Sequence, residues 1–190
     1  MELKTIIPNQ FTKGLTIFYS GQIFTVVDFQ HVKLGRGDAF MRVKLKNFVT
    51  GRVFEETFRS EEKISQAIIH ERRVTYLYSN AGLFYFMDTE TGTEIILPEE
   101  KISKEKSFLK EGDTVTILQS GNEPVALQLP LFVELKVTKT SPSVKGNTVS
   151  GGSKPAELQT GLKITVPLFI NEGDTVKVGT RTGEYVERVE

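Results

Sequence analysis

The chain has 190 residues, of which 38% are hydrophobic and 25% charged, as in an ordinary globular protein. It contains no cysteine and only two histidines, which excludes disulfides, thiolate metal sites and cysteine nucleophiles, and no metal site is expected. Its 24 basic and 24 acidic side chains balance, so the net charge does not indicate a protein that coats nucleic acid. The sequence contains no run of about eighteen apolar residues, the length that a membrane-spanning helix needs. We expect a cytoplasmic protein.

The charge is unevenly distributed. Residues 1–65 carry 10 basic and 7 acidic side chains, residues 66–130 carry 6 and 10, and residues 131–190 carry 8 and 7. Within residues 30–52, Asp38 is the single acid among six cations, which are Lys33, Arg36, Arg42, Lys44, Lys46 and Arg52. The first third therefore predicts a local cationic patch.

Short runs of β-prone residues separated by turn signals follow one another and predict an all-β protein of small barrels. Four hairpins are expected: 16–19 with 22–29, 39–46 with 53–58, 73–78 with 83–87, and 114–118 with 125–129. Further strands are expected at 132–138, 162–166, 175–178 and 184–189. One helix is expected over 98–109, because Pro98 suits a first turn and acidic residues precede basic ones.

Two joints divide the chain. The polar segment 60–65 and the step Leu129-Pro130 predict modules at 1–65, 66–129 and 130–190. The sequence Glu-Gly-Asp-Thr-Val occurs at 111–115 and again at 172–176, each time before an expected strand. This repeated sequence is explained either by two related barrels or by two unrelated turns of similar composition.

The strand at 39–46 alternates, so that Arg42, Lys44 and Lys46 fall on one face and form a cationic ridge. Directly before it, the residues Lys33, Gly35, Arg36 and Gly37 occupy a predicted hairpin tip. Flanking glycines allow a close backbone approach, and a projecting guanidinium backed by the ridge suits a phosphodiester backbone. RNA is the favoured ligand, and an ordinary solvated turn is the alternative.

A glycine-rich stretch lies in the last third. Its small, hydrogen-bonding residues suit a close approach to nucleic acid, although a flexible loop is the simpler interpretation. The residues are Gly146, Asn147, Thr148, Ser150, Gly151 and Gly152. The patterns GxxxxGK[ST], GxGxxG before a helix and GxSxG are absent from the sequence.

Together these features resemble bacterial elongation factor P over the whole chain. The family pattern K-x-A-x4-G-x2-[LIV]-x-V-P-x2-[LIV]-x2-G is met by Lys154, Ala156, Gly161, Ile164, Val166, Pro167, Ile170 and Gly173. The segments 35–40, 42–47 and 180–185 are also family-like. The resemblance implies an L-shaped all-β protein, with an SH3-like (KOW-type) first domain followed by two OB-fold domains.

The resemblance also implies a function. Family members bind the ribosome between the peptidyl (P) and exit (E) sites, position the acceptor end of the peptidyl-tRNA and promote peptide bond formation at consecutive prolines. By analogy Arg36 occupies the tip beside the acceptor end, with Lys33, Gly35 and Gly37 around it, and Gly146–Gly152 lies near the E-site codon of the mRNA. The implied factor has no catalytic side chain, cofactor or membrane partner, and we expect a monomer.

Three positions depart from the common family pattern. Arg36 stands where many members carry a modified lysine, so it is the candidate site for an arginine-modifying enzyme. Leu34 replaces a frequent proline, and Asn147 replaces a frequent aspartate. Some arginine-bearing members are rhamnosylated and others work unmodified, and the loop sequence does not distinguish these cases.

Other interpretations remain beside the resemblance. A generic RNA-binding or transcription-associated protein of KOW and OB modules is one; an enzyme is disfavoured because adjacent carboxylates on a strand point to opposite faces. A cluster of aromatic residues forms either a core or a base-stacking platform, with a core favoured. This cluster comprises Tyr76, Tyr78, Phe84, Tyr85 and Phe86. His31 is expected in a loop or against RNA, and His70 in a structural role.

Overall fold

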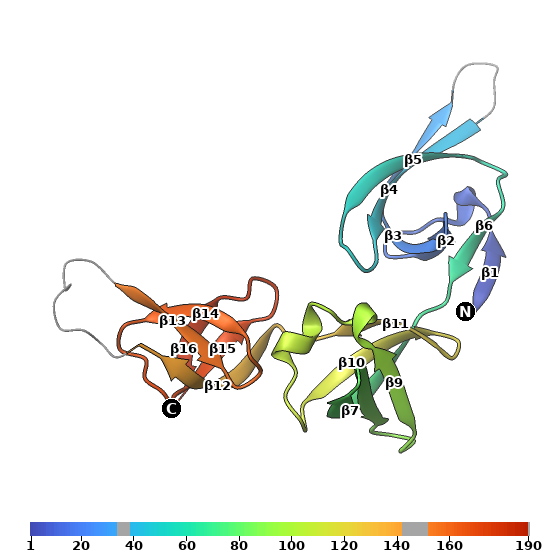
Figure 1. The fold of residues 1–190 in the computed structure, drawn as a ribbon. Coiled ribbons are helices and arrows are strands. Elements are labelled where there is room, and N and C mark those ends of the chain that lie inside the picture. Colours follow the sequence, from blue (N-terminus) through green and yellow to red (C-terminus); the bar gives the residue numbers. More distant parts are fainter. Residues whose placement is uncertain (34–38, 142–151, 190) are drawn as a thin grey trace. The chain divides into compact units, whose positions relative to one another are not determined.

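The computed structural model describes residues 1–33, 39–141 and 152–189, and most of its regular structure is β-strand (Figure 1). The strands in these residues form one six-stranded and two five-stranded sheets. The chain divides into two compact units. The first comprises Met1–Glu71 with Leu118–Ala126, and the second comprises Arg72–Ile117 with Leu127–Glu190.

The first unit contains the six-stranded sheet, in the order β1-β6-β2-β3-β4-β5. Its strands are β1 (Leu3–Ile6), β2 (Thr16–Tyr19), β3 (Gln22–Lys33), β4 (Ala39–Asn47), β5 (Val53–Arg59) and β6 (Ile64–Ala67), and the 3-10 helix η1 is Pro8–Gln10. Ser20 and Gly21 join β2 to β3 with φ of 46° and 79°, the left-handed conformation that a two-residue hairpin turn requires. The core of this sheet includes Ile17, Val26 and Phe58.

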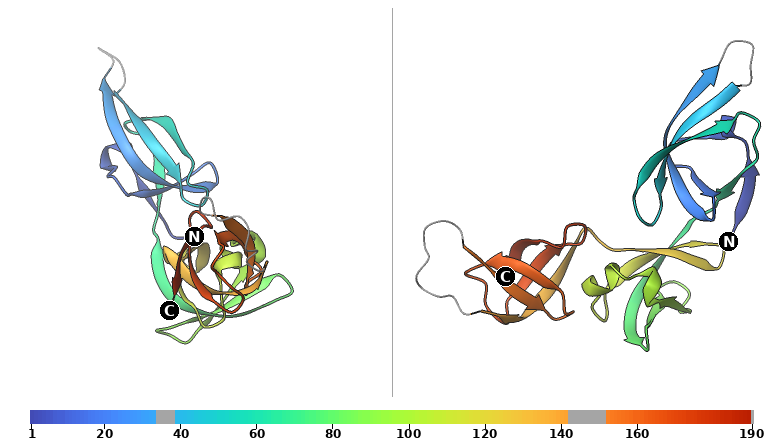
Figure 2. Two further views of the ribbon diagram at one scale, coloured as in Figure 1. Left: turned by 90° about the vertical axis from the view of Figure 1, so that its left-hand side faces the viewer. Right: turned by 45° about the horizontal axis from the view of Figure 1, so that its top comes forward.

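Strands β3 and β4 are the longest pair of this sheet, with 12 and 9 residues. They extend beyond the rest of the first sheet (Figures 1 and 2). Met41, Val43 and Leu45 are fully buried, whereas the side chains between them face solvent. The predicted alternation along 39–46 is therefore confirmed.

The hairpin tip at Leu118–Ala126 completes the first unit. The Glu2 backbone N–H donates to Ser120 Oγ at 2.9 Å, and this hydroxyl donates back to the Glu2 carbonyl at 3.2 Å. Ser120 is fully buried, so one side chain pairs with both backbone groups of Glu2.

The other two sheets have five strands each; the second unit contains the whole of one and, of the other, the residues outside His70–Glu71 and Leu118–Ala126. One is ordered β11-β10-β7-β8-β9, with β7 (His70–Asn80), β8 (Leu83–Asp88), β9 (Glu94–Pro98), β10 (Thr114–Ser120) and β11 (Glu123–Gln128). The other is ordered β14-β13-β12-β15-β16, with β12 (Phe132–Thr140), β13 (Ser153–Leu158), β14 (Lys163–Pro167), β15 (Thr175–Gly179) and β16 (Tyr185–Val189). When each set is counted in chain order, both sheets run 3-2-1-4-5.

The repeated Glu-Gly-Asp-Thr-Val sequence builds the same corner in both sheets. Gly112 and Gly173 have φ of 88° and 92°. The following aspartates, Asp113 and Asp174, accept the backbone N–H three residues earlier at 2.9 and 2.8 Å. Equal topology and equal corners favour two related barrels over coincident turn chemistry.

The helix expected over 98–109 is wrong. Two short 3-10 helices, η2 (Glu99–Lys101) and η3 (Glu105–Phe108), take its place, and Ile102 lies between them with a non-helical φ of −132° and ψ of 28°. Ile102 is buried in the core of the β7–β11 sheet, whereas Phe108 is buried in the core of the β12–β16 sheet. Six residues of α-helix would point these side chains about 120° apart, so the break lets each reach its own core.

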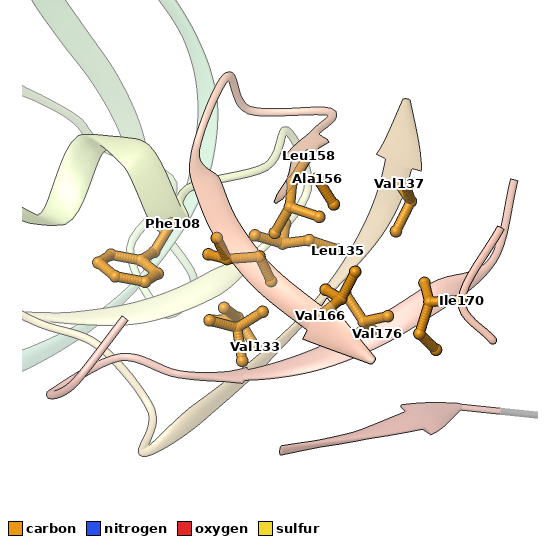
Figure 3. Close-up of a cluster of buried hydrophobic side chains, with 11 residues drawn as sticks. Phe108, Val133, Leu135, Val137, Ala156, Leu158, Val166, Ile170 and Val176 are labelled. Carbon is orange, nitrogen blue, oxygen red and sulfur yellow. The ribbon is translucent and has the colours of Figure 1, made fainter. Parts of the chain in front are cut away.

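Figure 3 shows Phe108 among the aliphatic side chains of that last core. Leu135, Val176 and Ile170 are fully buried there, and Phe108 is 8% exposed. A side chain from η3 thus completes the core of the neighbouring sheet in the same unit.

Four strands were not predicted: β1, β6, β9 and β13. The segment 60–65 was assigned to a joint because it is polar, yet β6 pairs with both β1 and β2. Strand β13 contains Pro155, which usually ends a strand interior. The proline is tolerated because the described pairing of β13 with β12 begins at Ala156.

Candidate nucleic-acid interface

Strand β4 carries the cationic ridge of Arg42, Lys44 and Lys46, and all three side chains are exposed. The buried residues between them hold the strand in the core, so the ridge has a rigid base. Among the described residues none of the three forms an ion pair.

Residues on the neighbouring strands compensate the positive charges of the ridge to different extents. Lys44 lies opposite Asp28 of β3 and Glu55 of β5, whereas Arg42 lies opposite Gln30 and Thr57. Lys46 has the uncharged neighbours Thr25 and Val53. The sequence count of six cations to one acid over residues 30–52 missed these carboxylates, because β3 and β5 bring them in from either side of that window.

Asp28 is held in its charged form. A hydrogen bond and ion pair with Lys13, 2.8 Å between Nζ and Oδ1, lower the pKa of the Asp28 carboxyl, and Lys44 lowers it further. Asp28 therefore keeps its negative charge beside Lys44 at neutral pH. A small cavity of about 110 Å³ between Asp28, Arg42, Lys44 and Glu55 marks this mixed-charge part of the ridge.

The predicted tip follows the end of this hairpin. Lys33 ends β3 and pairs with Ala39 of β4; Gly35, Arg36 and Gly37 lie outside the described residues. Ser60 binds the Ala39 carbonyl twice, with its backbone N–H at 3.0 Å and its hydroxyl at 2.7 Å. These bonds hold the first residue of β4 against the residue that directly follows β5.

The glycine-rich stretch is described only at its last residue. Gly146, Asn147, Thr148, Ser150 and Gly151 lie outside the described residues. Gly152 approaches Leu168 so closely that a Cβ atom on Gly152 would lie 2.8 Å from Leu168 Cδ1. A larger residue directly before β13 would therefore require the Leu168 side chain to shift.

The aromatic cluster separates into two groups. Tyr76, Phe84 and Phe86 are buried, as the core interpretation predicted. Tyr78 and Tyr85 lie on the other face of the sheet and stack with ring centroids 4.5 Å apart. The alternation of β8 separates Tyr85 from its buried neighbours, which is a signal that the sequence contained.

Both histidines are exposed. His70 Nε2 lies 3.2 Å from Glu2 Oε2, and the His31 ring contacts Phe29 edge-on. Within residues 1–33, 39–141 and 152–189, no three acidic or histidine side chains gather as a metal site would need. No helix in the same residues is long and apolar enough to cross a membrane.

A six-stranded sheet with an exposed cationic ridge, followed by two five-stranded sheets of one topology, defines a class of proteins built from small β-barrels, a class that includes nucleic-acid-binding OB folds. Family models match the chain in three places. The matches are the elongation factor P KOW-like domain at residues 8–64, the elongation factor P OB domain at 69–127 and the elongation factor P C-terminal domain at 133–188.

Individual relatives agree with the family models. Elongation factor P of Caldanaerobacter subterraneus is 52% identical over 184 residues, covering 97% of this chain and 100% of that protein. Elongation factor P of Thermoanaerobacter sp. is 50% identical, with the same two coverages. The chain belongs to the elongation factor P family of translation factors.

Solved structures support the fold. A eukaryotic translation initiation factor 5A from Methanococcus jannaschii has a TM-score of 0.50 and 20% identity, covering 66% of this chain and 94% of that one. A translation initiation factor eIF-5A family protein from Naegleria fowleri has a TM-score of 0.52 and 14% identity, covering 68% of this chain and 100% of that one. The all-β architecture of KOW-like and OB-fold domains is thereby confirmed.

Proposed function

We propose that this chain binds the ribosome between the P and E sites and promotes peptide bond formation at consecutive prolines. Family membership over nearly the whole chain is the observation that carries the proposal. In this role the tip residues Lys33, Gly35, Arg36 and Gly37 face the acceptor end of the P-site peptidyl-tRNA. The stretch Gly146–Gly152 faces the E-site codon.

In this proposal the contacts of the cationic ridge with RNA determine where the tip lies on the tRNA. Arg42, Lys44 and Lys46 bind the RNA backbone without reading its sequence, because phosphate contacts fix register and orientation. The paired strands β3 and β4 transmit that position toward Arg36, and the two bonds from Ser60 to Ala39 keep their base fixed.

The factor contributes alignment and no bond-making group. Proline is a constrained nucleophile, so its reaction depends strongly on how the acceptor end of the peptidyl-tRNA is held. Ideal positioning lowers a barrier by up to about 7–11 kcal/mol, and a stalled step needs only a small part of this. Fixed contacts at the tip reduce the entropy that the reacting ends lose.

Reconstituted translation of a message encoding three consecutive prolines tests the proposal. Unmodified recombinant protein is expected to shorten the pause at the prolines and to leave a proline-free message unchanged. Absence of rescue by protein purified from its native cells, which carries any modification of Arg36, would contradict it. Retained affinity for free RNA without ribosome binding would favour the generic RNA-binding protein.

Because the three ridge charges are compensated to different extents, we expect their alanine variants to differ in the salt dependence of ribosome binding. Arg42→Ala and Lys46→Ala are each expected to reduce the log–log salt slope of ribosome binding by roughly 0.7–0.9, the value for one phosphate contact. Lys44→Ala is expected to change the slope less, because Asp28 and Glu55 already compensate its charge. Binding titrations at several salt concentrations measure this, with Lys63→Ala, an exposed lysine beyond β5, as the control. Equal slopes for all three ridge variants would contradict the assignment.

A further inference from the structure

The cationic ridge of Arg42, Lys44 and Lys46 has two carboxylates on its own face. Asp28 of β3 and Glu55 of β5 flank Lys44 from opposite sides. The Asp28 side chain is 49% exposed, and Glu55 is exposed as well. In the part of the chain that the structure describes, neither carboxylate forms an ion pair with a ridge cation. Negative charges weaken the binding of phosphates, so phosphate binding alone does not account for these two side chains.

A β-bulge places Asp28 on the face of the ridge. The pairing of β3 with β4 shifts in register between Val26 and Asp28, so that Asp28 lies opposite Lys44. A strand without this shift would bring Val27 opposite Lys44 and turn Asp28 to the side of the buried Val43. Bulges re-aim side chains and are frequent beside functional sites. Regular pairing is therefore interrupted at the position that brings a carboxylate onto the ridge.

Lys13 holds this carboxylate in place and in its charged form. Lys13 Nζ lies 2.8 Å from Asp28 Oδ1, and this hydrogen bond and ion pair lower the pKa of the Asp28 carboxyl. An exposed ion pair contributes little to stability, so stability does not account for the arrangement. An ionised carboxylate has about four lone-pair sites and no donor. Asp28 therefore keeps acceptor sites beside the bond from Lys13.

The two carboxylates border a small polar cavity. It has a volume of about 110 Å³ and is lined by Asp28, Phe29, Gln30, Arg42, Lys44 and Glu55. Pockets for whole ligands are typically about 300–1,000 Å³, so this cavity suits a single polar group. That group must donate a hydrogen bond to a carboxylate and lie next to phosphates that the cations hold. The 2′-hydroxyl of RNA meets both conditions, because it is attached to the sugar between two phosphates, and DNA lacks it.

We propose that Asp28 and Glu55 accept hydrogen bonds from ribose 2′-hydroxyl groups of A-form RNA, while Arg42 and Lys46 bind the neighbouring phosphates. The inference rests on the proposed function, in which the ridge contacts the acceptor stem of the P-site tRNA. The wide, shallow minor groove of A-form RNA displays its 2′-hydroxyls beside the backbone, within reach of an exposed strand face. The cations alone would bind any phosphodiester backbone, and the carboxylates make the surface selective for RNA.

The test compares two ribosome complexes that differ in the acceptor stem of the P-site tRNA. One stem is ordinary RNA. In the other stem every ribose carries a 2′-fluoro group, which keeps the A-form geometry but cannot donate a hydrogen bond. The dissociation constant for the 2′-fluoro complex divided by that for the ordinary complex measures what the hydroxyl groups contribute. For the wild-type protein we expect a ratio of about ten or more, because one hydrogen bond to a charged group contributes at least about that factor.

The double variant Asp28→Ala with Glu55→Ala is expected to bring this ratio to about one. It should also bind the 2′-fluoro complex at least as tightly as the wild type, because two negative charges beside the phosphates are removed. The matched control is Glu61→Ala with Glu71→Ala, which removes the same charge from exposed positions of the same unit, away from the ridge. This control should keep the wild-type ratio. The melting temperature of each variant shows whether the fold is preserved.

The outcomes separate this inference from the function on which it rests. A wild-type protein that neither binds the ordinary complex nor shortens the pause at consecutive prolines would overturn the proposed function, and the inference with it. Binding and rescue with a wild-type ratio of one would overturn the recognition of hydroxyl groups alone. A wild-type ratio above one that the double variant keeps would show that other residues recognise the hydroxyls. Equal weakening of both complexes together with a lower melting temperature would assign the two carboxylates to stability and would also overturn the inference.

Discussion

Arg36→Ala is expected to remove most of the rescue of ribosomes stalled at consecutive prolines. One charged hydrogen bond contributes about 1.5–3 kcal/mol, so the rate of escape should fall by roughly ten-fold to more than a hundred-fold. In the sequence Arg36 comes after the last residue of β3 and before the first residue of β4, so its replacement changes no residue of these strands and folding should be unaffected. Reconstituted translation of a triple-proline message measures the rate, and circular dichroism measures the fold.

Arg181→Ala is the control for this variant, because Arg181 is exposed in the turn before β16 and carries the same charge. It should rescue normally. Normal rescue by Arg36→Ala as well would show that the tip assignment is wrong. Comparing the intact mass of native and recombinant protein then reveals whether the Arg36 side chain is modified in the cell.

Phe108→Ala is expected to lower the stability of the second unit by about 3–5 kcal/mol, the usual cost of removing a buried phenylalanine. The ring is part of the β12–β16 core although its backbone belongs to η3. The loss should therefore fall mainly on the β12–β16 sheet, which would unfold before the β7–β11 sheet. Urea unfolding followed by hydrogen exchange of the two sheets distinguishes their midpoints.

Phe169→Ala provides the comparison for Phe108→Ala. Phe169 belongs to the same unit but is 58% exposed, so its replacement should change stability by less than about 0.5 kcal/mol. Coincident midpoints for both sheets in Phe108→Ala would contradict a loss of stability that falls mainly on the β12–β16 sheet.

Much of the fold was predictable because hairpins are local. The strands around Ser20-Gly21 and around Thr50-Gly51 were predicted within a few residues, since turn glycines and alternation both lie in one short window. Strands β1 and β6 were not, because such short segments are ordered by pairing with strands distant in the sequence: β6 pairs with both β1 and β2. The break at Ile102 was missed for a related reason: it depends on two separate cores.

The candidate interface was predictable in part. The exposure of Arg42, Lys44 and Lys46 followed from alternation with buried neighbours. The compensation of Lys44 by Asp28 and Glu55 did not, because it depends on the registers of β3 and β5. Lys154, which the family pattern marks, donates a hydrogen bond to the Ser141 carbonyl, and this partner could not be predicted from the pattern.

The hairpin β10–β11 also has a consequence for synthesis of the protein. Its tip, Leu118–Ala126, belongs to the first unit, although most residues of that unit precede position 72. A chain growing from its N-terminus therefore cannot make the bonds between Glu2 and Ser120 until residue 120 has left the ribosomal exit tunnel. The first unit closes only after most of the β7–β11 sheet has been translated, so the two units mature in an interleaved order.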